Sequence, residues 1–280
     1  MTVSVFIPTY NASGCIDETL KSVLCQTYKD LEVWVVDDCS PDDTVAILRR
    51  WQERDSRVNI LTKEKNEGFV PYSWNRVFPR LKGELTLYMS HDDYLSPDCI
   101  ELLVKSQQES GVDAVIPDCV FVYDDGSEKS SFSSSITFSA RKAFARMLNY
   151  DIPGFALWRT SLIKEIGMPT EAWNSDEGMQ RIWALNCKNG VALCPQAKFF
   201  YRISQSSITK GLKPYHLTGL KTQKRLFKAA FLSGTCFCYP KAFLRFVWQY
   251  LKSYVYLNKY NSTAIYIFDL LCSSFLYKVY

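Results

Sequence analysis

Two pairs of aspartates follow apolar runs that have the length and composition of buried strands. Asp37–Asp38 follows Leu31–Val36, and Asp92–Asp93 comes shortly after Leu85–Met89. Neighbouring carboxylates repel each other unless a cation lies between them. A hard divalent ion such as Mg²⁺ or Mn²⁺, held by one or two carboxylates and by substrate phosphates, relieves that repulsion. Because such an ion can neutralise a diphosphate leaving group, the pairs predict metal-assisted chemistry on a phosphorylated substrate.

A structural role is the simpler alternative for each pair, since Asp37–Asp38 can cap the following turn and Asp92–Asp93 can cap a helix. Their equivalent positions at the ends of two strands favour the functional interpretation. Rival motifs are absent from the sequence. Pro8–Asn11 stands where a GxGxxG loop would follow the first strand, and neither GxxxxGK[ST] nor GxSxG occurs.

The elements that must position these residues alternate between two periods in the first half of the chain. Short apolar runs predict strands at Val3–Ile7, Leu31–Val36, Val58–Leu61 and Leu85–Met89, with a fifth that begins at Asp113. Apolar residues at helical spacing predict helices at Ile16–Leu24, Pro41–Trp51 and Val70–Leu81, and another that begins near Pro97. This alternation predicts an α/β fold with a Rossmann-like, mostly parallel sheet and helices on both faces. Ligands bind such sheets beyond the carboxyl ends of the strands, where the paired aspartates lie.

The pattern changes after Tyr123. Asp124–Ser135 is rich in serine and acidic residues, which predicts a loop or a hairpin. Ala140–Leu148 predicts a helix, and Asp151–Gly167 predicts a short strand combined with a helix. Asp176–Cys187 predicts a further helix, whose acidic first turn suits the helix dipole.

The composition is that of a folded globular protein, with 280 residues of which 47% are hydrophobic and 22% charged. It excludes a disordered, collagen-like or coiled-coil protein. The ten cysteines include no CxxC pair and there are two histidines, which argues against a zinc site. We find no signal-peptide pattern and no run of about 20 apolar residues. We therefore expect a reducing, cytoplasmic setting with free thiols.

The net charge of +4 conceals a basic tail. Residues 1–197 contain 20 Lys and Arg against 28 Asp and Glu, whereas residues 198–280 contain 13 against one. Within the tail, Lys241–Lys259 repeats polar residues every three or four positions opposite an aromatic face, the pattern of a helix in a membrane interface. The alternative is that the tail packs on the rest of the chain or forms a homodimer interface. The acidic first part and the lack of a recognition motif argue against nucleic acid as a partner.

Six segments, in this order and spacing, resemble glycosyltransferase family 2, whose members have the GT-A nucleotide-sugar-binding fold. They are Val3–Asn11, Cys25–Tyr28, Leu31–Thr44, Asn66–Asn75, Gly83–Asp98 and Ser175–Arg181. Phe199–Lys210 also resembles a segment of bacterial members that build surface polysaccharide. The resemblance covers Val3 to about Ser207. We expect a GT-A domain over residues 1–215 and a C-terminal helical, membrane-associating extension over residues 216–280.

The resemblance implies a nucleotide-sugar site at the strand ends. Thr9 and Tyr10 would line the nucleobase pocket, and Asp38 would contact the base. Tyr201 and Arg202 would lie near the diphosphate. The expected nucleotide-binding residues are Pro8, Thr9, Tyr10, Asn11, Asp37, Asp38, Asn66, Gly68, Ser90, Asp92 and Asp93.

The family's DxD metal motif corresponds to Ser90–Asp92. Asp92 would ligate Mn²⁺ or Mg²⁺, Asp93 would support that site, and His216 would be a further metal ligand. Ser90 replaces the first aspartate of the motif, which leaves the metal geometry open.

The resemblance places the catalytic carboxylates at Asp176 and Glu177, where the usual Glu-Asp order is reversed. Asp176 is favoured as the base, with Glu177 as the alternative. A carboxylate within hydrogen-bond reach of an acceptor hydroxyl removes its proton as the oxygen attacks the anomeric carbon opposite the diphosphate. Such a single displacement inverts the configuration of the sugar.

The resemblance thus implies an inverting glycosyltransferase that uses a nucleotide-diphosphate sugar, with a UDP-sugar favoured. The acceptor would be a hydroxyl of a glycan, or of a glycan linked to polyprenyl diphosphate, in capsule, O-antigen or similar polysaccharide assembly. We expect a peripheral protein on the inner face of the cytoplasmic membrane. Two alternatives stay open: an inactive nucleotide-sugar-binding scaffold subunit, and a sugar-phosphate nucleotidyltransferase. The loop after the first strand contains no Lys or Arg, which argues against the second.

Overall fold

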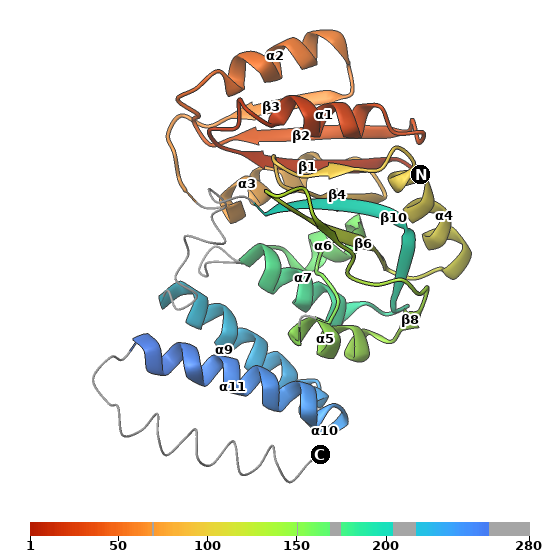
Figure 1. Ribbon diagram of the computed structural model, residues 1–280, viewed down its shortest axis with the longest axis vertical. Helices are drawn as coiled ribbons and strands as arrows, with labels where there is room; N and C mark the ends of the chain where they lie inside the picture. Colours follow the sequence, from red (N-terminus) through yellow and green to blue (C-terminus); the bar gives the residue numbers. More distant parts are fainter. Residues whose placement is uncertain (69, 150, 169–174, 204–216, 258–280) are drawn as a thin grey trace.

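One mixed β-sheet runs through the part of the chain that the structure describes (Figure 1). The computed structural model describes residues 1–68, 70–149, 151–168, 175–203 and 217–257, with the backbone alone at 175–177, 217–223 and 249–257. The strand order is β3-β2-β1-β4-β9-β6-β10-β5, with β7 paired to β6 and β8 paired to β10. The strands are β1 (Val3–Thr9), β2 (Leu31–Asp37), β3 (Val58–Thr62), β4 (Leu85–Tyr88), β5 (Tyr94–Leu95), β6 (Ala114–Tyr123), β7 (Glu128–Lys129), β8 (Thr137–Phe138), β9 (Leu157–Arg159) and β10 (Val191–Ile203).

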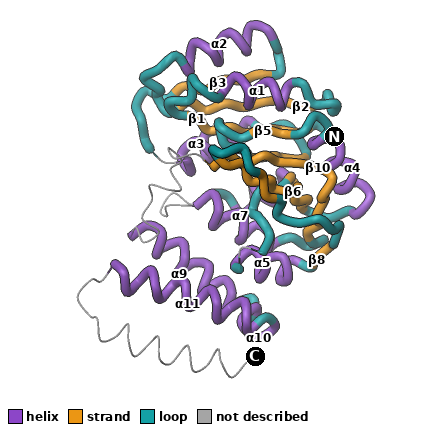
Figure 2. Tube along the Cα trace, viewed as in Figure 1, coloured by secondary structure: helices purple, strands orange, loops and turns teal. Residues whose placement is uncertain are grey.

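Helices cover both faces of the sheet, as the two-period sequence pattern predicts (Figure 2). One face packs against α1 (Ile16–Leu24), α2 (Thr44–Arg54) and α4 (Cys99–Ser110). The other packs against α3 (Val70–Val77), α5 (Ala140–Leu148), α6 (Thr160–Ile166) and α7 (Ser175–Asn186). All seven residues of β1 are buried, because helices cover both faces of that strand.

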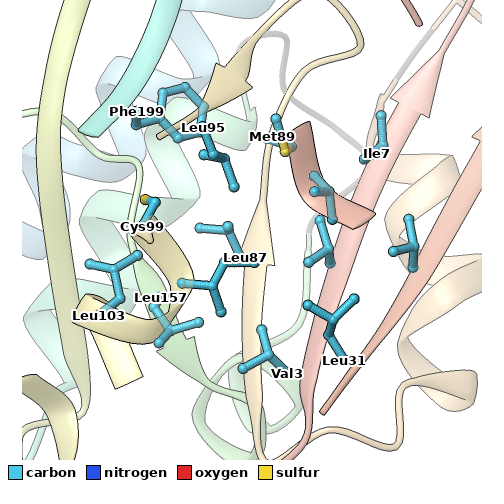
Figure 3. Close-up of a cluster of buried hydrophobic side chains, with 14 of the residues drawn as sticks. Val3, Ile7, Leu31, Leu87, Met89, Leu95, Cys99, Leu103, Leu157 and Phe199 are labelled. Atoms are coloured by element: carbon cyan, nitrogen blue, oxygen red, sulfur yellow. The ribbon is translucent and has the colours of Figure 1, made fainter. Parts of the chain in front are cut away.

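The hydrophobic core under α1 and α4 contains aliphatic side chains from successive strands (Figure 3). Val3, Ile7 and Leu87 are fully buried there, and Leu103 of α4 is fully buried against them. Phe6 points to the opposite face, where its ring centroid lies 4.5 Å from that of Trp74. Neighbouring residues of a strand point to opposite faces of the sheet, so β1 packs against the helices on both faces. The rigid frame ends at the carboxyl edge of β1, β2 and β4.

The sheet is parallel from β3 through β2 and β1 to β4, as predicted. Beyond β4 it is mixed, because the three-residue β9 runs antiparallel to both β4 and β6. The longest strand, β10, was not predicted from the sequence. Pro195 interrupts its apolar run, and a proline inside such a run argues against a strand. The structure accommodates Pro195 at an irregularity, where the register with β6 shifts between Cys194 and Lys198.

Helix α2 begins three residues later than predicted, at Thr44 instead of Pro41. The carboxylate of Asp42 accepts hydrogen bonds from the backbone N–H groups of Ser13 and Thr44, at 2.9 and 3.1 Å. A carboxylate that bonds the backbone two residues ahead forms a turn, which competes with the helix. Burial opposes ionisation of Asp42, but the hydrogen bonds from Thr44 and Ser13 outweigh it and lower its pKa strongly.

The C-terminal helices α9 (Leu217–Leu232), α10 (Thr235–Cys238) and α11 (Pro240–Leu257) pack on α5 and α7 (Figure 1). Leu226, Ala230 and Phe246 are buried against Phe144 and Leu148 of α5. The helical extension is therefore joined to the sheet domain by its own apolar core; its expected boundary at residue 216 lies outside the described residues. Among the described helices, none has both the length and the apolar character needed to cross a bilayer. All cysteines in the described residues are free thiols.

Candidate functional site

Three strands end together at the expected edge of the sheet. Thr9 at the end of β1 lies opposite Asp37 at the end of β2, and the N–H of Asp38 donates to the carbonyl of Thr9 at 2.9 Å. On the other side, the N–H of Met89 after β4 donates to Phe6 of β1 at 3.1 Å. Parallel pairing of adjacent strands therefore brings together the two aspartate pairs, which are more than 50 residues apart in sequence.

The carboxylate of Asp38 holds the loop that contains Asn66 and Gly68. Oδ1 accepts the N–H of Glu67 at 2.9 Å, and Oδ2 accepts the N–H of Gly68 at 2.8 Å. Lys63 adds an ion pair to Oδ1 at 3.0 Å. A carboxylate offers about four acceptor positions, so Oδ2 keeps capacity for one more donor. Asp38 thus holds a distant loop, whereas Asp37 caps the following turn, and Asp38 keeps room for a ligand N–H.

Asn66 and Gly68 are exposed, on the loop that Asp38 holds. Gly68 has a φ of +59°, and a Cβ at this position would lie 3.6 Å from Oδ1 of Asn66. Gly tolerates this left-handed backbone conformation at no steric cost. The loop therefore passes Asp38 with its backbone N–H groups facing the carboxylate.

Asp37 is fully buried, and its carboxylate bonds to Ser40. Oδ2 accepts the N–H of Ser40 at 3.0 Å and Oδ1 accepts its hydroxyl at 2.5 Å. The Ser40 hydroxyl in turn accepts the N–H of Asn11 at 2.9 Å. Asn11 itself has a φ of +52°. Asp37 therefore positions the β1 and β2 loops against each other, and its contact with a nucleotide stays a prediction.

The last residues of β1 and the residue that follows them offer a surface for a planar ligand. Pro8 and Thr9 are buried, whereas Tyr10 is 42% exposed. Thr9 Oγ1 is buried and has no hydrogen-bond partner among the described residues. A buried hydroxyl without a hydrogen-bond partner lowers the stability of the folded protein. A ligand polar group that formed a hydrogen bond with it would therefore be bound more tightly.

The loop from Ser90 to Asp93 is fixed from two sides. His91 Nδ1 lies 3.3 Å from the carbonyl oxygen of Pro8, and the hydroxyl of Thr19 lies 2.7 Å and 2.8 Å from the carbonyl oxygens of His91 and Asp93. Ser90 and Asp92 are partly exposed, and the structure shows no hydrogen bond or ion pair from the Asp92 carboxylate to a described residue. Asp92 is therefore available to a ligand at this edge of the sheet.

Asp93 lies directly behind this loop and is only 1% exposed. Burial, reinforced by the nearby Asp92, raises its pKa well above the usual value. Its Oδ1 accepts the N–H of Arg202 at 3.2 Å, while Oδ2 has no partner among the described residues. An unsatisfied carboxylate oxygen next to a second, accessible carboxylate suits a hard divalent cation that also binds substrate phosphates.

A complete metal site is not present among the described residues, where no group of three potential His, Cys, Asp or Glu ligands occurs. His216, the expected further ligand, lies outside the described residues. The donor set that the structure supplies is thus Asp92 with Asp93, to which the oxygens of a diphosphate would be added. This set fits a cation shared with the substrate.

Cys15 faces the same edge of the sheet. Burial and the nearby Asp92 raise the pKa of its thiol to about 11. The thiol is therefore neutral near pH 7 and is a poor nucleophile. Its position shows instead that α1 forms one wall beside Asp92.

Arg202 lies at a second wall of the site. Its guanidinium forms an ion pair with Glu18 at 2.5 Å and lies 4.8 Å from the centroid of the Tyr94 ring. Tyr201 packs against Phe121 and Phe155. The backbone of Arg202 thus contacts Asp93 while its side chain is held against α1, and its approach to a diphosphate stays a prediction.

Asp176 and Glu177 lie in the first turn of α7, where the structure describes the backbone. This helix is anchored by Trp183, which is fully buried and 5.4 Å from Trp74 of α3. Figure 1 shows the start of α7 on the side of the molecule where α3 lies, and α3 directly follows the Asn66–Gly68 loop. The fold brings the start of α7 to the same side as the strand ends, and the catalytic role of its two acids stays a prediction.

A buried cation was missed by the sequence analysis. Lys63 has a 3% exposed side chain, and its Nζ lies 3.0 Å from both Asp38 and Glu67. Arg76 forms the outer ion pair with Glu67 at 2.9 Å. Burial opposes ionisation of Glu67, but Lys63 and Arg76 outweigh it and lower its pKa. The only signal in the sequence is a lysine directly after a strand, which is common on protein surfaces.

Replacing Lys63 by methionine is expected to cost about 3–5 kcal/mol of folding stability, because two carboxylates lose their buried cation. Urea unfolding followed by tryptophan fluorescence measures this loss. The matched control is Arg76→Met. The Arg76 side chain is 45% exposed and forms the outer ion pair of the same network, with Glu67. That variant should cost less than about 1 kcal/mol. Equal losses for the two variants would contradict the assigned role of Lys63.

Comparison with known proteins gives a consistent set of relatives. Glycosyltransferase GlyG of Streptococcus pneumoniae is 33% identical over 114 residues, which is 41% of this chain and 38% of that protein. The poly(ribitol-phosphate) beta-N-acetylglucosaminyltransferase TarS of Staphylococcus aureus is 25% identical over 205 residues, 72% of this chain and 35% of TarS. The chain spans less than half the length of these curated relatives.

Solved structures share the fold. TarS 1–349 in complex with UDP-GlcNAc matches with a TM-score of 0.75 at 19% identity, over 90% of this chain and 73% of that one. The mannosyltransferase PcManGT of Pyrobaculum calidifontis, in complex with GDP-Man and Mn²⁺, matches with a TM-score of 0.60 at 18% identity, over 99% and 80% of the two chains. These likenesses confirm the predicted GT-A fold. The model of the family "Glycosyl transferase family 2" matches residues 4–167, which is more than half of the chain, and it includes both aspartate pairs. The chain therefore belongs to glycosyl transferase family 2.

Proposed function

We propose that this protein is an inverting glycosyltransferase that moves a sugar from a nucleotide-diphosphate donor, with a UDP-sugar favoured, to a hydroxyl of a glycan. The observation that carries the proposal is the convergence of Asp38, Asp92 and the Asn66–Gly68 loop at one edge of a family 2 sheet. The complexes of TarS with UDP-GlcNAc and of PcManGT with GDP-Man support a nucleotide sugar as the donor.

The proposed donor site is built from the strand ends. The nucleobase lies beside Tyr10, with an N–H directed at the remaining acceptor position of Asp38. The loop of Asn66 and Gly68 lies at the edge of this pocket, and the diphosphate extends toward Ser90 and Asp92. Asp37 supports this site through the turn at Ser40.

A divalent cation would be held by Asp92 with Asp93, and His216 is the proposed further ligand. When bound, it supplies positive charge that offsets the charge developing on the diphosphate leaving group. The PcManGT complex, which contains Mn²⁺, supports a divalent cation, Mn²⁺ or Mg²⁺, at this site. Thr19 keeps the loop of these carboxylates in place through its two contacts with backbone carbonyls.

Transfer would proceed in one displacement. The carboxylate of Asp176, or of Glu177, accepts the proton of an acceptor hydroxyl at the start of α7. The oxygen then bonds to the anomeric carbon as the bond to the diphosphate breaks, and the nucleoside diphosphate leaves. The attack comes from the face opposite the leaving group, so the configuration is inverted.

The acceptor that we propose is a glycan, or a glycan linked to polyprenyl diphosphate, of capsule, O-antigen or a related bacterial surface polysaccharide. The names of the relatives, among them TarS and chondroitin synthase, support polysaccharide assembly as the setting. A lipid-linked acceptor would be met at the inner face of the cytoplasmic membrane. The basic tail supports such a peripheral location, and a homodimer stays a further possibility for the same surface.

Calorimetry of UDP and GDP binding to the full chain, with Mn²⁺ and again with EDTA, tests the donor site. The expected result is UDP binding that weakens at least about tenfold when the metal is removed, because the cation links the diphosphate to Asp92. A folded sample that binds neither nucleotide under either condition would overturn the donor site. The inactive scaffold, motivated by Ser90 in place of an aspartate and by the reversed order of Asp176 and Glu177, predicts no turnover of any UDP-sugar.

A further inference from the structure

The largest exposed apolar side chains of the described residues gather at the turn between α9 and α10. Leu232 is 72% exposed, Phe237 is 77% exposed and Phe231 is 57% exposed. The ring centroids of Phe231 and Phe237 lie 6.2 Å apart, so the two rings form one surface. A contiguous exposed apolar patch, especially one rimmed by polar residues, marks an interaction site, whereas single exposed apolar residues do not. We call Phe231, Leu232 and Phe237 the apolar tip.

The apolar tip is not the surface that the sequence pattern predicts. In the Lys241–Lys259 pattern, the aromatic face that lies opposite the polar residues includes Phe243, Phe246, Val247 and Trp248. The structure uses part of that side for packing, since Phe246 is 4% exposed and Phe243 packs against the same cluster. Helix α11 therefore fixes the tail to α5 and α9, and the exposed apolar side chains lie beside this packed cluster, at the α10 end of α9 (Figure 2).

The charge around the apolar tip has one sign. Residues 217–248 contain six Lys and Arg and no Asp or Glu. Lys224, Lys228 and Lys241 of this segment are exposed. Apolar aromatic groups flanked by exposed cations suit the interface of a bilayer that contains anionic lipids. A second copy that docked through this same surface would set like charges against each other, because residues 217–257 contain no Asp or Glu.

A cavity next to the apolar tip extends this surface. It has a volume of about 970 Å³ and lies between the C-terminal helices and the β8–α5 turn. Arg141 and Lys188 lie on its wall together with Leu232, and its lining contains no Asp or Glu. An anionic headgroup would meet cations there while its acyl chains meet the apolar tip.

We infer that the apolar tip and the cations beside it form a docking surface for a bilayer that contains anionic phospholipid. Phe231, Leu232 and Phe237 enter the interface, and Lys224, Lys228 and Arg141 face the headgroups. Docking at this end of α9 holds the protein through its helical extension and leaves the strand ends of the sheet free of lipid contact.

The test is cosedimentation of the full chain with vesicles of phosphatidylcholine, with and without about 30% phosphatidylglycerol. The expected result is binding to the anionic vesicles alone, with partition reduced by at least about tenfold in Phe231→Ser/Phe237→Ser and in Lys224→Glu/Lys228→Glu. The matched control is Ile136→Ser, which removes a 42% exposed apolar side chain from the sheet domain and should bind like the parent. Thermal unfolding of each variant checks that it is folded.

Three outcomes would overturn the lipid surface. The first is equal binding to vesicles with and without phosphatidylglycerol. The second is full binding by both double variants. The third is a stable oligomer, measured by light scattering without vesicles, that Phe231→Ser/Phe237→Ser dissociates, because the apolar tip would then be an interface between copies. Nucleotide binding is measured separately and should be unchanged in the tip variants, so failure of the donor site and failure of this surface are distinguishable.

Discussion

Asp92→Asn is expected to abolish the effect of Mn²⁺ on UDP binding. Asp92 is the partly exposed carboxylate of the Ser90–Asp93 loop, and it has no protein partner in the described residues. An amide in its place is a far weaker ligand for a hard cation. Nucleotide affinity measured with Mn²⁺ should fall to the value that the parent shows in EDTA. Transfer should fall by about a hundredfold or more, because charge on the leaving diphosphate is no longer offset.

Asp43→Asn is the matched control for this variant. Asp43 is an exposed aspartate in the loop after β2, and its side chain makes no capping hydrogen bond. Asp43→Asn should keep both the parent's affinity for UDP and the dependence of that affinity on Mn²⁺. If UDP binding by Asp92→Asn still depended fully on Mn²⁺, the cation would have to bind outside this loop. The assignment of both Asp92 and Asp93 as metal ligands would then be wrong.

The part of the fold that carries the site follows from local patterns. Four apolar runs and the helices between them give β1 to β4 with short connections, and chirality then allows few arrangements. The run Val191–Ile203 shows the limit of such reasoning. Its proline is compatible with a strand only because the pairing with β6 shifts register at that point, which depends on residues 77 to 80 positions earlier.

The residues of the candidate site likewise fall into those that the sequence reveals and those that only the fold reveals. The aspartate pairs are visible in the sequence because strand ends must converge at one edge. Lys63 is not visible, because its importance arises from burial between Asp38 and Glu67, which only the folded loop creates. The unequal environments of Asp92 and Asp93 are likewise invisible, since adjacent identical residues differ here only in exposure.

The tail illustrates the difference between composition and surface. Its charge and aromatic content indicate a membrane interface, and the described helices keep that charge exposed. Which aromatic side chains remain outside depends on how α11 packs on α5. Ala242 and Phe246 are buried and Phe243 packs beside them, so one face of α11 belongs to the core.

Asp176→Asn is expected to lower sugar transfer by about 10²–10⁴-fold and to leave nucleotide binding unchanged. Asp176 lies in the first turn of α7, where the positive end of the helix dipole favours the ionised form that a base requires. The helix is held further along by Trp183 and Ala184, both fully buried. An isosteric change in its first turn should therefore leave the packing of α7 intact.

Glu177→Gln is the paired variant that separates the two acids, because residues i and i+1 of a helix point in different directions. Only one of the two carboxylates can face the acceptor hydroxyl, so the two variants should differ strongly in transfer while they share the parent's affinity for UDP. UDP-sugars are first ranked by their affinity for the parent protein. The measurement is then release of UDP from the UDP-sugar that binds most tightly, with a bacterial membrane extract as the source of acceptor. Loss of transfer in Glu177→Gln alone would make Glu177 the base. Full transfer in both variants would remove the base from α7, and the proton would then have to be accepted elsewhere at the strand ends, where Asp93 is buried and Asp38 already bonds to Lys63 and the Gly68 loop.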